Sequence, residues 1–312
     1  FAHHDTIFPL FLFIAGVSFP YSVAKQRAGG MSEGRIYAKI VRRGLTLVVL
    51  GMVYNGLFKL DFENLRIASV LGRIGLAWSI AAVLYLNFGV KTRAAIAVAV
   101  LAGYGALSAL VAAPDAAGAG PLTFEGNLAG YIDRQFLPGK LIYGSFDPEG
   151  LLSTVPAVVT AMLGMFTGEF VRRGDIRGGR KTLWMAAAAA ALLAAGLAFS
   201  GVLPVNKKLW SSTFVCVVGA YSLGMFALFY YLIDVRGWRR WTLFFRVVGL
   251  NSITIYLAQR IVGFGRISDF FLGGIASKCP EAVAAVISSA GYVAVCWLFL
   301  YFLYRKNVFL KV

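Results

Sequence analysis

Long apolar runs alternate with short polar segments along the chain. A helix that crosses a bilayer needs about 20 consecutive, mostly apolar residues. The pattern predicts about nine such helices, at residues 5–24, 36–58, 68–88, 93–113, 150–171, 182–202, 210–235, 241–264 and 282–304. Because the polar segments between them are too short for a second globular domain, we expect an all-α, polytopic membrane helix bundle that forms one domain over residues 1–312.

Residues 114–149 form the longest connection between the predicted helices. The segment is rich in glycine and proline, with polar residues interspersed. Connections of this length are more often functional or disordered than simple linkers. Inside the helix predicted at 150–171, Gly164 and Gly168 have the spacing of small residues that let two membrane helices approach closely. Such small-residue faces are compatible with a homodimer.

The composition supports a membrane protein and argues against a nucleic-acid partner. Hydrophobic residues make up 59% of the chain and charged residues 14%, about half the charged fraction of a soluble domain. A net charge of +16 would suggest nucleic-acid binding in a soluble protein. Here the basic residues lie between apolar runs, so membrane topology explains them better, and the lipid bilayer is the expected partner.

The charged residues divide unevenly between the two sets of connections that nine helices would place on opposite sides. One set, which includes the C-terminus, holds 19 basic and four acidic residues, and the other holds ten of each. Basic residues are concentrated on the cytoplasmic side of membrane proteins. We therefore expect the C-terminus and the basic set in the cytoplasm, with Phe1 and the 114–149 loop outside. A cytoplasmic N-terminus would need one more helix upstream of Phe1.

Polar residues near the predicted outer ends of the helices are candidates for a binding site. Arg73 lies inside an apolar run, where an ionisable group usually faces a cavity or a partner. Several basic residues on one side would suit a phosphate-bearing ligand, because guanidinium binds phosphate through two hydrogen bonds. The alternative is an arginine that snorkels to the membrane surface or forms a structural ion pair.

Two further groups have both a functional and a structural interpretation. Asp147 and Glu149 precede a predicted helix, so they either cap its N-terminus or contact a ligand. His3 and His4, beside Asp5, are either a general base oriented by a carboxylate or solvated loop residues. The three cysteines and two histidines show no metal-ligand spacing, so we expect no metal. These residues alone fit a transporter, a membrane transferase or a channel.

Seven segments, in order along the chain, match the motifs of one known family. The first is His4-Asp5-Thr6-Ile7-Phe8-Pro9-Leu10-Phe11-Leu12-Phe13-Ile14-Ala15-Gly16-Val17. The others lie at residues 66–73, 130–134, 147–150, 204–211, 249–253 and 304–306. Together they resemble the heparan-α-glucosaminide N-acetyltransferase family. The resemblance covers essentially the whole chain, and the sequence is similar to a bacterial member, which implies a multi-pass protein of the bacterial inner membrane.

The resemblance implies a transmembrane acyltransferase. Family members move acetyl from cytoplasmic acetyl-CoA to the amine of a terminal glucosamine on the other side of the membrane. The family's histidine belongs to a stretch upstream of Phe1, so its role is not transferred to His3 or His4. The chain as given would then lack the catalytic histidine.

The remaining roles are transferred residue by residue. Asp5 would orient the upstream motif. The expected donor-binding residues are Arg66, Arg73, Asn206, Lys207 and Asn251. Asp147 and Glu149 would bind the acceptor amine as an ammonium. The alternatives are a transporter or flippase without group transfer, and an O-acyltransferase that acts on envelope glycans.

Overall fold

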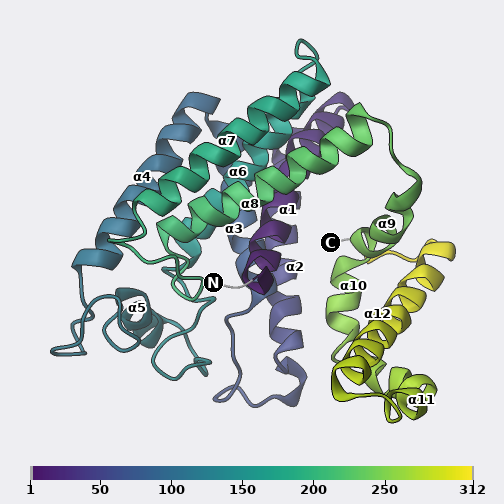
Figure 1. The fold of residues 1–312 in the computed structure, drawn as a ribbon. Helices are drawn as coiled ribbons and strands as arrows, with labels where there is room; N and C mark the ends of the chain where they lie inside the picture. The colour runs from purple at the N-terminus through teal and green to yellow at the C-terminus, as the bar shows by residue number, and fades with distance from the viewer. Residues whose placement is uncertain (1–2, 311–312) are drawn as a thin grey trace. The chain divides into compact units, whose positions relative to one another are not determined.

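The computed structural model describes residues 3–310 and confirms an all-α membrane fold (Figure 1). Its helices group into two compact units, Phe1–Arg236 and Gly237–Val312. Seven helices are long and apolar enough to cross a membrane. A bent pair of helices in the second unit would make an eighth span if it crosses as one.

Among the described residues, the first unit contains eight α-helices. They are α1 (Ile7–Ala28), α2 (Glu33–Tyr54), α3 (Val70–Asn87), α4 (Val90–Leu110), α5 (Leu128–Phe136), α6 (Thr154–Arg172), α7 (Gly178–Ala198) and α8 (Ser212–Tyr230). All except α2 and α5 belong to candidate membrane spans. These six helices agree with predicted apolar runs. The prediction relied on apolar length, which is also what a helix needs to cross a bilayer.

Polar contacts at the helix ends show that the long helices of this unit alternate in direction. The Asn55 amide, at the end of α2, donates to the carbonyls of Arg66 and Ala68 just before α3, at 2.7 and 2.8 Å. At the other end, Arg93 near the start of α4 pairs with Glu169 near the end of α6, at 2.6 Å. The loops at residues 59–67, 114–149 and 203–209 therefore share one end of the unit. We call it the loop end, and the opposite end the basic end.

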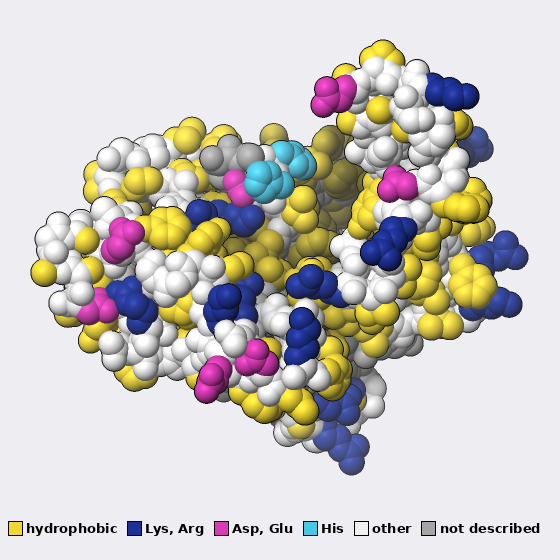
Figure 2. Space-filling view, turned by 90° about the horizontal axis from the view of Figure 1, so that it is seen from below, with side chains coloured by type: hydrophobic (Ala, Val, Ile, Leu, Met, Phe, Trp, Pro, Cys, Tyr) yellow, Lys and Arg dark blue, Asp and Glu magenta, His cyan; other side chains and the backbone are white. Residues whose placement is uncertain are grey.

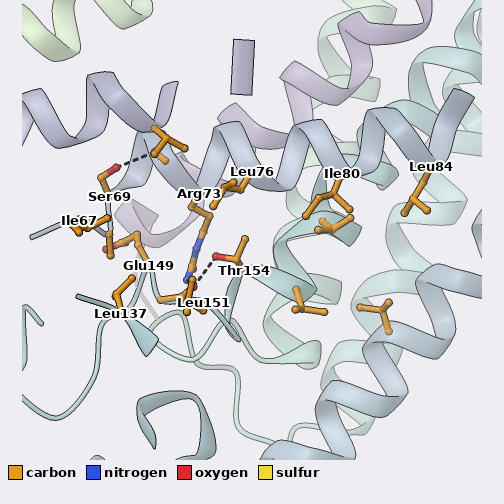
Figure 3. Close-up of a pocket in the computed structure, with 17 residues that line it drawn as sticks. Ile67, Ser69, Arg73, Leu76, Ile80, Leu84, Leu137, Glu149, Leu151 and Thr154 are labelled. Atoms are coloured by element: carbon orange, nitrogen blue, oxygen red, sulfur yellow. Dashed lines mark hydrogen bonds between the residues drawn. The ribbon is translucent and has the colours of Figure 1, made fainter. Parts of the chain in front are cut away.

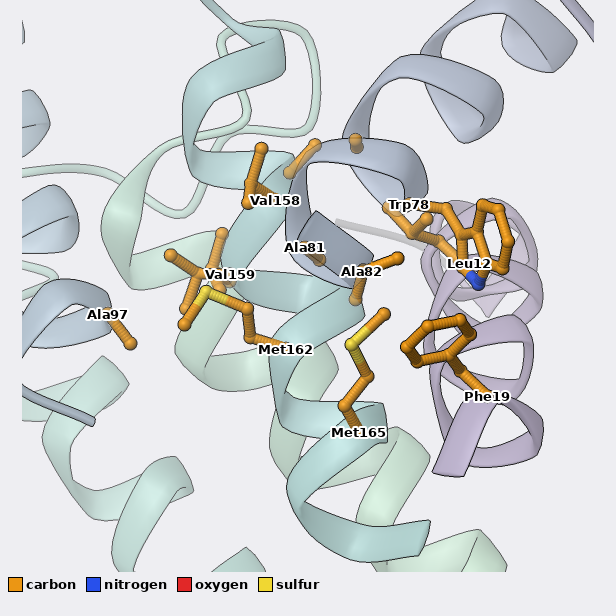
Figure 4. Close-up of a cluster of buried hydrophobic side chains, with 14 of the residues drawn as sticks. Leu12, Phe19, Trp78, Ala81, Ala82, Ala97, Val158, Val159, Met162 and Met165 are labelled. Carbon is orange, nitrogen blue, oxygen red and sulfur yellow. The ribbon is translucent and has the colours of Figure 1, made fainter. Parts of the chain in front are cut away.

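The core of the first unit surrounds α6. Met162 and Met165 from α6 pack with Phe19 from α1 and Trp78 from α3 (Figure 4). The Trp78 ring meets Phe19 edge to face, with centroids 5.4 Å apart, and its indole nitrogen donates to the Ala15 carbonyl at 3.2 Å. These contacts hold α1, α3 and α6 in a fixed register, which positions their loop-end termini.

Helices α1 and α6 approach so closely that only glycine fits between them. A Cβ at Gly16 would lie 2.2 Å from the Ala161 carbonyl oxygen, and one at Gly164 would lie 2.0 Å from that of Phe13. Gly168 meets the Val17 carbonyl in the same way. The Gly164–Gly168 spacing is therefore a packing motif within the chain, as the sequence predicted.

The second unit contains α9 (Leu243–Leu250), α10 (Ser252–Ala258), α11 (Phe264–Ala276) and α12 (Glu281–Arg305). The predicted span at 241–264 is not one straight helix. It breaks at Asn251, whose backbone leaves the helical region, and α9 and α10 meet at an angle of 58°. Helix α11 occupies most of the segment that we expected to be a loop at 265–281.

Helix α2 also differs from the prediction. It forms over the expected residues, but it is not among the helices apolar enough to qualify as a span. Lys39, Arg42 and Arg43 lie in its first half, and three charges are costly in the bilayer interior. The second half of α2 carries the apolar run that the pattern detected.

Candidate functional site

A buried ion-pair network joins two loops at the loop end of the first unit. The Arg66 guanidinium donates from Nε to Asp147 Oδ2 at 2.7 Å and from Nη2 to Asp147 Oδ1 at 2.6 Å. The same Nη2 donates to a Glu149 carboxylate oxygen. Burial alone would lower the pKa of Arg66, but its bonds to the two carboxylates outweigh burial and raise it. Arg66 is thus a fixed cation whose Nε and Nη2 are engaged by these two carboxylates.

Asp147 is fully buried, and both of its carboxylate oxygens are occupied. Besides Arg66, Oδ1 accepts from the Glu149 backbone N–H at 3.0 Å and Oδ2 accepts from that of Ile142 at 3.3 Å. Asp147 does not cap α6, because that helix begins later, at Thr154, with Ser153 at the N-cap position. Its surroundings leave no free oxygen for a ligand amine, whereas Glu149 remains partly exposed.

Asp133, on α5, fixes the backbone of the same loop. Its Oδ2 accepts from the Asp147 N–H at 3.2 Å, and its Oδ1 accepts from the Leu151 N–H at 2.9 Å. Burial raises the pKa of Asp133 to about 6, against the opposing effect of these two backbone hydrogen bonds. A Cβ at Gly150 would lie 2.0 Å from the Asp133 carboxylate. Glycine is therefore required where the loop crosses this side chain.

Arg73, on the first turn of α3, is almost completely buried, with 2% of its surface exposed. Its Nη2 donates to the Ser153 hydroxyl and, at 3.4 Å, to the Gly150 carbonyl. Its guanidinium lies 4.9 Å from the centre of the Trp210 ring. Among the described residues, Nε and Nη1 of Arg73 have no hydrogen-bond partner. An unpaired buried guanidinium is costly, so Arg73 is well placed to bind an anionic or carbonyl group.

A cavity of about 370 Å³ lies beside Arg73, between α3 and α6 (Figure 3). Arg73, Glu149 and Ser69 line it toward the loop end. Away from the loop end, its wall is apolar and includes Leu76, Ile80 and Leu84 from one face of α3 (Figure 3). Valines from α4 and α6 complete this wall. The volume falls within the range of small-molecule sites, and its lining would suit a ligand with one polar and one apolar end.

Asp5 and Lys207 bring the start of the chain to the 203–209 loop. Lys207 Nζ lies 3.1 Å from Asp5 Oδ1, and His4 Nε2 lies 3.4 Å from the same oxygen. Figure 2 looks onto the loop end, where the two histidines (cyan) lie among acidic and basic side chains. His3 Nε2 hydrogen-bonds with the Tyr221 hydroxyl at 3.1 Å. Phe8 contacts Trp210 edge to face at 4.9 Å, which connects this group to Arg73.

The two candidate asparagines have different environments. Asn206 shapes its own loop, since its Oδ1 accepts from the backbone N–H groups of Lys208 and Leu209 at 2.8 and 3.4 Å. Asn251 belongs to the second unit and is 1% exposed. Its Oδ1 accepts from the Thr254 hydroxyl at 3.3 Å, and its amide nitrogen has no partner among the described residues. Asn251 therefore marks the break between α9 and α10.

Seven of the eight predicted site residues lie in the first unit, where these contacts gather them at the loop end. Sequence reasoning missed Asp133 and Trp210 as members of the group. Both lie within segments that carried the family resemblance, so that signal was available. Within residues 3–310, no group of three or more His, Cys, Asp or Glu side chains is placed to hold a metal ion.

Comparison with known proteins supports the family resemblance. The chain is 27% identical to human and 25% identical to mouse heparan-alpha-glucosaminide N-acetyltransferase, in both cases over 99% of its length. It spans about half the length of these curated relatives, 54% in each case. No protein-family model matches the chain. The similarity is thus distant, but it extends over both structural units and confirms the resemblance carried by the seven segments.

Proposed function

We propose that this chain is an N-acetyltransferase of the membrane, which moves acetyl from acetyl-CoA to the amine of a terminal glucosamine or a similar amino sugar. The observation that carries the proposal is the similarity to two heparan-alpha-glucosaminide N-acetyltransferases over nearly the whole chain. The loop-end site gives this proposal a location. It combines a buried arginine that has free donors, a partly exposed carboxylate and an adjacent cavity.

The chemistry sets clear requirements for such a site. The amine must lose a proton before its nitrogen can attack the thioester carbonyl carbon. The C–N bond then forms, the C–S bond breaks, and CoA leaves as a thiolate that takes up a proton. A carboxylate can hold the acceptor as an ammonium, a base must accept the proton, and a cation can stabilise the developing oxyanion.

Glu149 is the residue that we propose holds the acceptor amine. Its carboxylate lines the cavity and is 12% exposed, whereas Asp147 is completely buried. Asp147 and Arg66 act as positioning residues, because both oxygens of Asp147 are engaged and Arg66 pairs with both carboxylates. Arg66 fixes the Glu149 carboxylate through its direct ion pair. The acceptor-binding role that we expected for both carboxylates is thereby assigned to one.

Arg73 and Lys207 are the cations that we propose bind the acyl donor. Arg73 has unpaired donors, and Lys207 is held by Asp5, which is 16% exposed. Asp5 thus positions Lys207, and its expected role in orienting the upstream motif stays a prediction. Asn206 fixes the loop that carries Lys207 through its two backbone hydrogen bonds. Asn251 belongs to the second unit, and its expected role in donor binding stays a prediction from the sequence.

The charge distribution supports a proposed orientation in the membrane. In the first unit, the basic end carries Arg27, Arg93, Arg172 and Lys181, and the proposed site lies at the opposite end. Because basic residues favour the cytoplasm, we propose that the site faces the outside of a bacterial inner membrane. The acceptor would then reach the site from outside, and the acetyl end of a donor supplied from the cytoplasm would have to extend through the helix bundle to Arg73.

Release of free CoA by the purified full-length protein, which includes the residues upstream of Phe1, tests the proposal. Acetyl-CoA is supplied with and without glucosamine, and both free thiol and N-acetylglucosamine are measured. We expect CoA release that requires glucosamine and falls sharply in Arg73→Gln and Glu149→Gln variants. Turnover with hydroxyl acceptors but not amines would indicate an O-acyltransferase. Vesicles that accumulate the sugar without acetylating it would instead support a transporter.

A further inference from the structure

A second cavity lies within the second unit, at the end where α9 begins and α12 finishes. Its volume is about 620 Å³, and it is lined by Arg246, Leu250, Tyr304, Arg305, Asn307 and Phe309. Arg246 comes from the first turn of α9, and Arg305 is the last residue of α12. Two arginines from separate helices therefore line one hollow, and both of their side chains are exposed.

Within the described part of the second unit, no carboxylate neutralises the positive charge of this cavity. No ion pair joins Arg246 or Arg305 to a carboxylate within residues 3–310. Glu281 begins α12 and Arg305 ends it, so the 25 residues of the helix separate them by roughly 36 Å at 1.5 Å per residue.

The other acidic residue of this unit, Asp269, is also remote along the helices. It follows Ser268, which lies against Gly291, 14 residues before Arg305, or roughly 21 Å along α12. Charges are screened beyond roughly 8–10 Å in physiological salt. Neither acidic residue can offset the two arginines.

Aromatic rings form the rest of the wall. The Arg246 guanidinium lies 5.8 Å from the centre of the Tyr304 ring, and Tyr304 meets Phe309 edge to face at 6.4 Å. Helix α12 is a candidate membrane span that ends at Arg305, so the cavity lies where that helix would leave the bilayer. Asn307 adds an amide donor that no described residue engages. The cavity thus offers cations, a neutral donor and an apolar wall.

We propose that Arg246 and Arg305 form a phosphate-binding site. Guanidinium groups bind phosphate oxygens through paired, charge-assisted hydrogen bonds, and an anion would relieve the repulsion between the two cations. The phosphate belongs either to a soluble phosphorylated nucleotide, whose base would stack on the aromatic wall, or to an anionic phospholipid head group. The site does not depend on the acetyltransferase proposal, because it rests on charge and geometry in the second unit alone.

Direct binding to the purified protein in phosphatidylcholine nanodiscs tests the site. The soluble probe is ADP, and the lipid probe is phosphatidylglycerol introduced at increasing fractions. We expect at least one probe to bind, and its affinity to fall about tenfold or more in Arg246→Gln and in Arg305→Gln, as expected for losing a hydrogen bond to a charged group. Arg246→Lys and Arg305→Lys should retain part of the affinity, because lysine keeps the positive charge but cannot donate two parallel hydrogen bonds to phosphate.

The matched control is Arg266→Gln, which removes an exposed arginine from the start of α11 outside the cavity. Circular dichroism verifies that each variant is folded. Arginine-dependent binding of ADP would identify a nucleotide site, and the same dependence for phosphatidylglycerol alone would identify a head-group site. The proposal is overturned if neither probe binds, or if the Arg246, Arg305 and Arg266 variants all bind as the unmodified protein does.

Discussion

Arg66 and Asp147 are 81 residues apart in the sequence, yet they form a two-bond ion pair in which the carboxylate is completely buried. The pair joins the loop that leads into α3 to the loop that leads into α6. Both helices carry residues of the proposed site, namely Arg73 on α3 and Thr154 at the start of α6. The ion pair therefore fixes the distance between the two walls of the cavity.

Removing the positive partner should destabilise the protein strongly. Arg66→Gln leaves the Asp147 carboxylate buried without a counter-charge, and breaking a buried pair in this way costs about 3–5 kcal/mol. Thermal unfolding in detergent, followed by circular dichroism, would measure the loss. The control is Arg173→Gln, because Arg173 forms a similar two-bond pair with Asp175 at the surface. That pair should contribute at most about 1 kcal/mol. Equal losses of stability in the two variants would contradict the conclusion that the Arg66–Asp147 pair is a buried structural pair.

Glu149→Gln should impair acceptor binding more than stability. The variant keeps the Arg66–Asp147 pair but removes the charge that we propose holds the ammonium. A hydrogen bond to a charged group contributes about 1.5–3 kcal/mol, so the KM for glucosamine should rise about tenfold or more while the KM for acetyl-CoA changes little. Glu125→Gln, in the same loop, serves as the control because Glu125 is exposed. An unchanged glucosamine KM would remove Glu149 from the site.

The stability of the loop end should depend on pH through Asp133. Its pKa is raised to about 6 in the folded protein by burial, against about 3.9 in an unfolded chain. The folded state therefore binds the proton more tightly than the unfolded chain does. The stabilisation from this protonation is fully present below pH 4 and is lost as the pH rises through 6. The difference corresponds to about 3 kcal/mol.

Unfolding temperatures measured between pH 4 and 7 would detect this dependence. Asp133→Asn should flatten the profile in that window, because the titrating group is gone. Asp61→Asn provides the control, since it removes an exposed carboxylate from the 59–67 loop. A profile for the Asp133 variant that parallels that of the unmodified protein would show that another group is responsible.

The sequence predicted the membrane helices well where apolar length alone defines them. Helices α1, α3, α4, α6, α7, α8 and α12 all lie within or close to predicted runs. The break at Asn251 was not foreseen, because the residues on both sides are apolar and hydropathy does not report backbone direction. Helix α11 was missed because its 13 residues are too few for a span.

The site was predicted in outline but not in its internal connections. Apolar surroundings identified Arg73 as unusual, and the positions of Asp147 and Glu149 before a helix identified them as polar groups near a terminus. The sequence could not distinguish their roles, since Asp147 is engaged by Arg66 from a distant loop and by Ile142 in its own loop. Such tertiary partners decide whether a carboxylate is saturated or available, and local patterns do not contain them.

The contact between α1 and α6 should tolerate no side chain at Gly16. An alanine there would place its Cβ 2.2 Å from the Ala161 carbonyl oxygen, and both atoms are held by helical backbones. The helices would have to separate, at a cost of about 1–3 kcal/mol or more. The matched control is Gly103→Ala in α4, where a Cβ meets nothing within 4 Å and the better helix propensity of alanine should stabilise the helix by about 0.5–1 kcal/mol. Unfolding by a denaturing detergent would measure both changes in stability.

Because α1 follows Asp5 and α6 follows Asp147, the Gly16 variant should also lose activity with both substrates. If Gly16→Ala destabilises the protein and Gly103→Ala stabilises it, the loss results from the close approach of α1 and α6. If Gly16→Ala leaves stability unchanged, the two helices do not approach this closely.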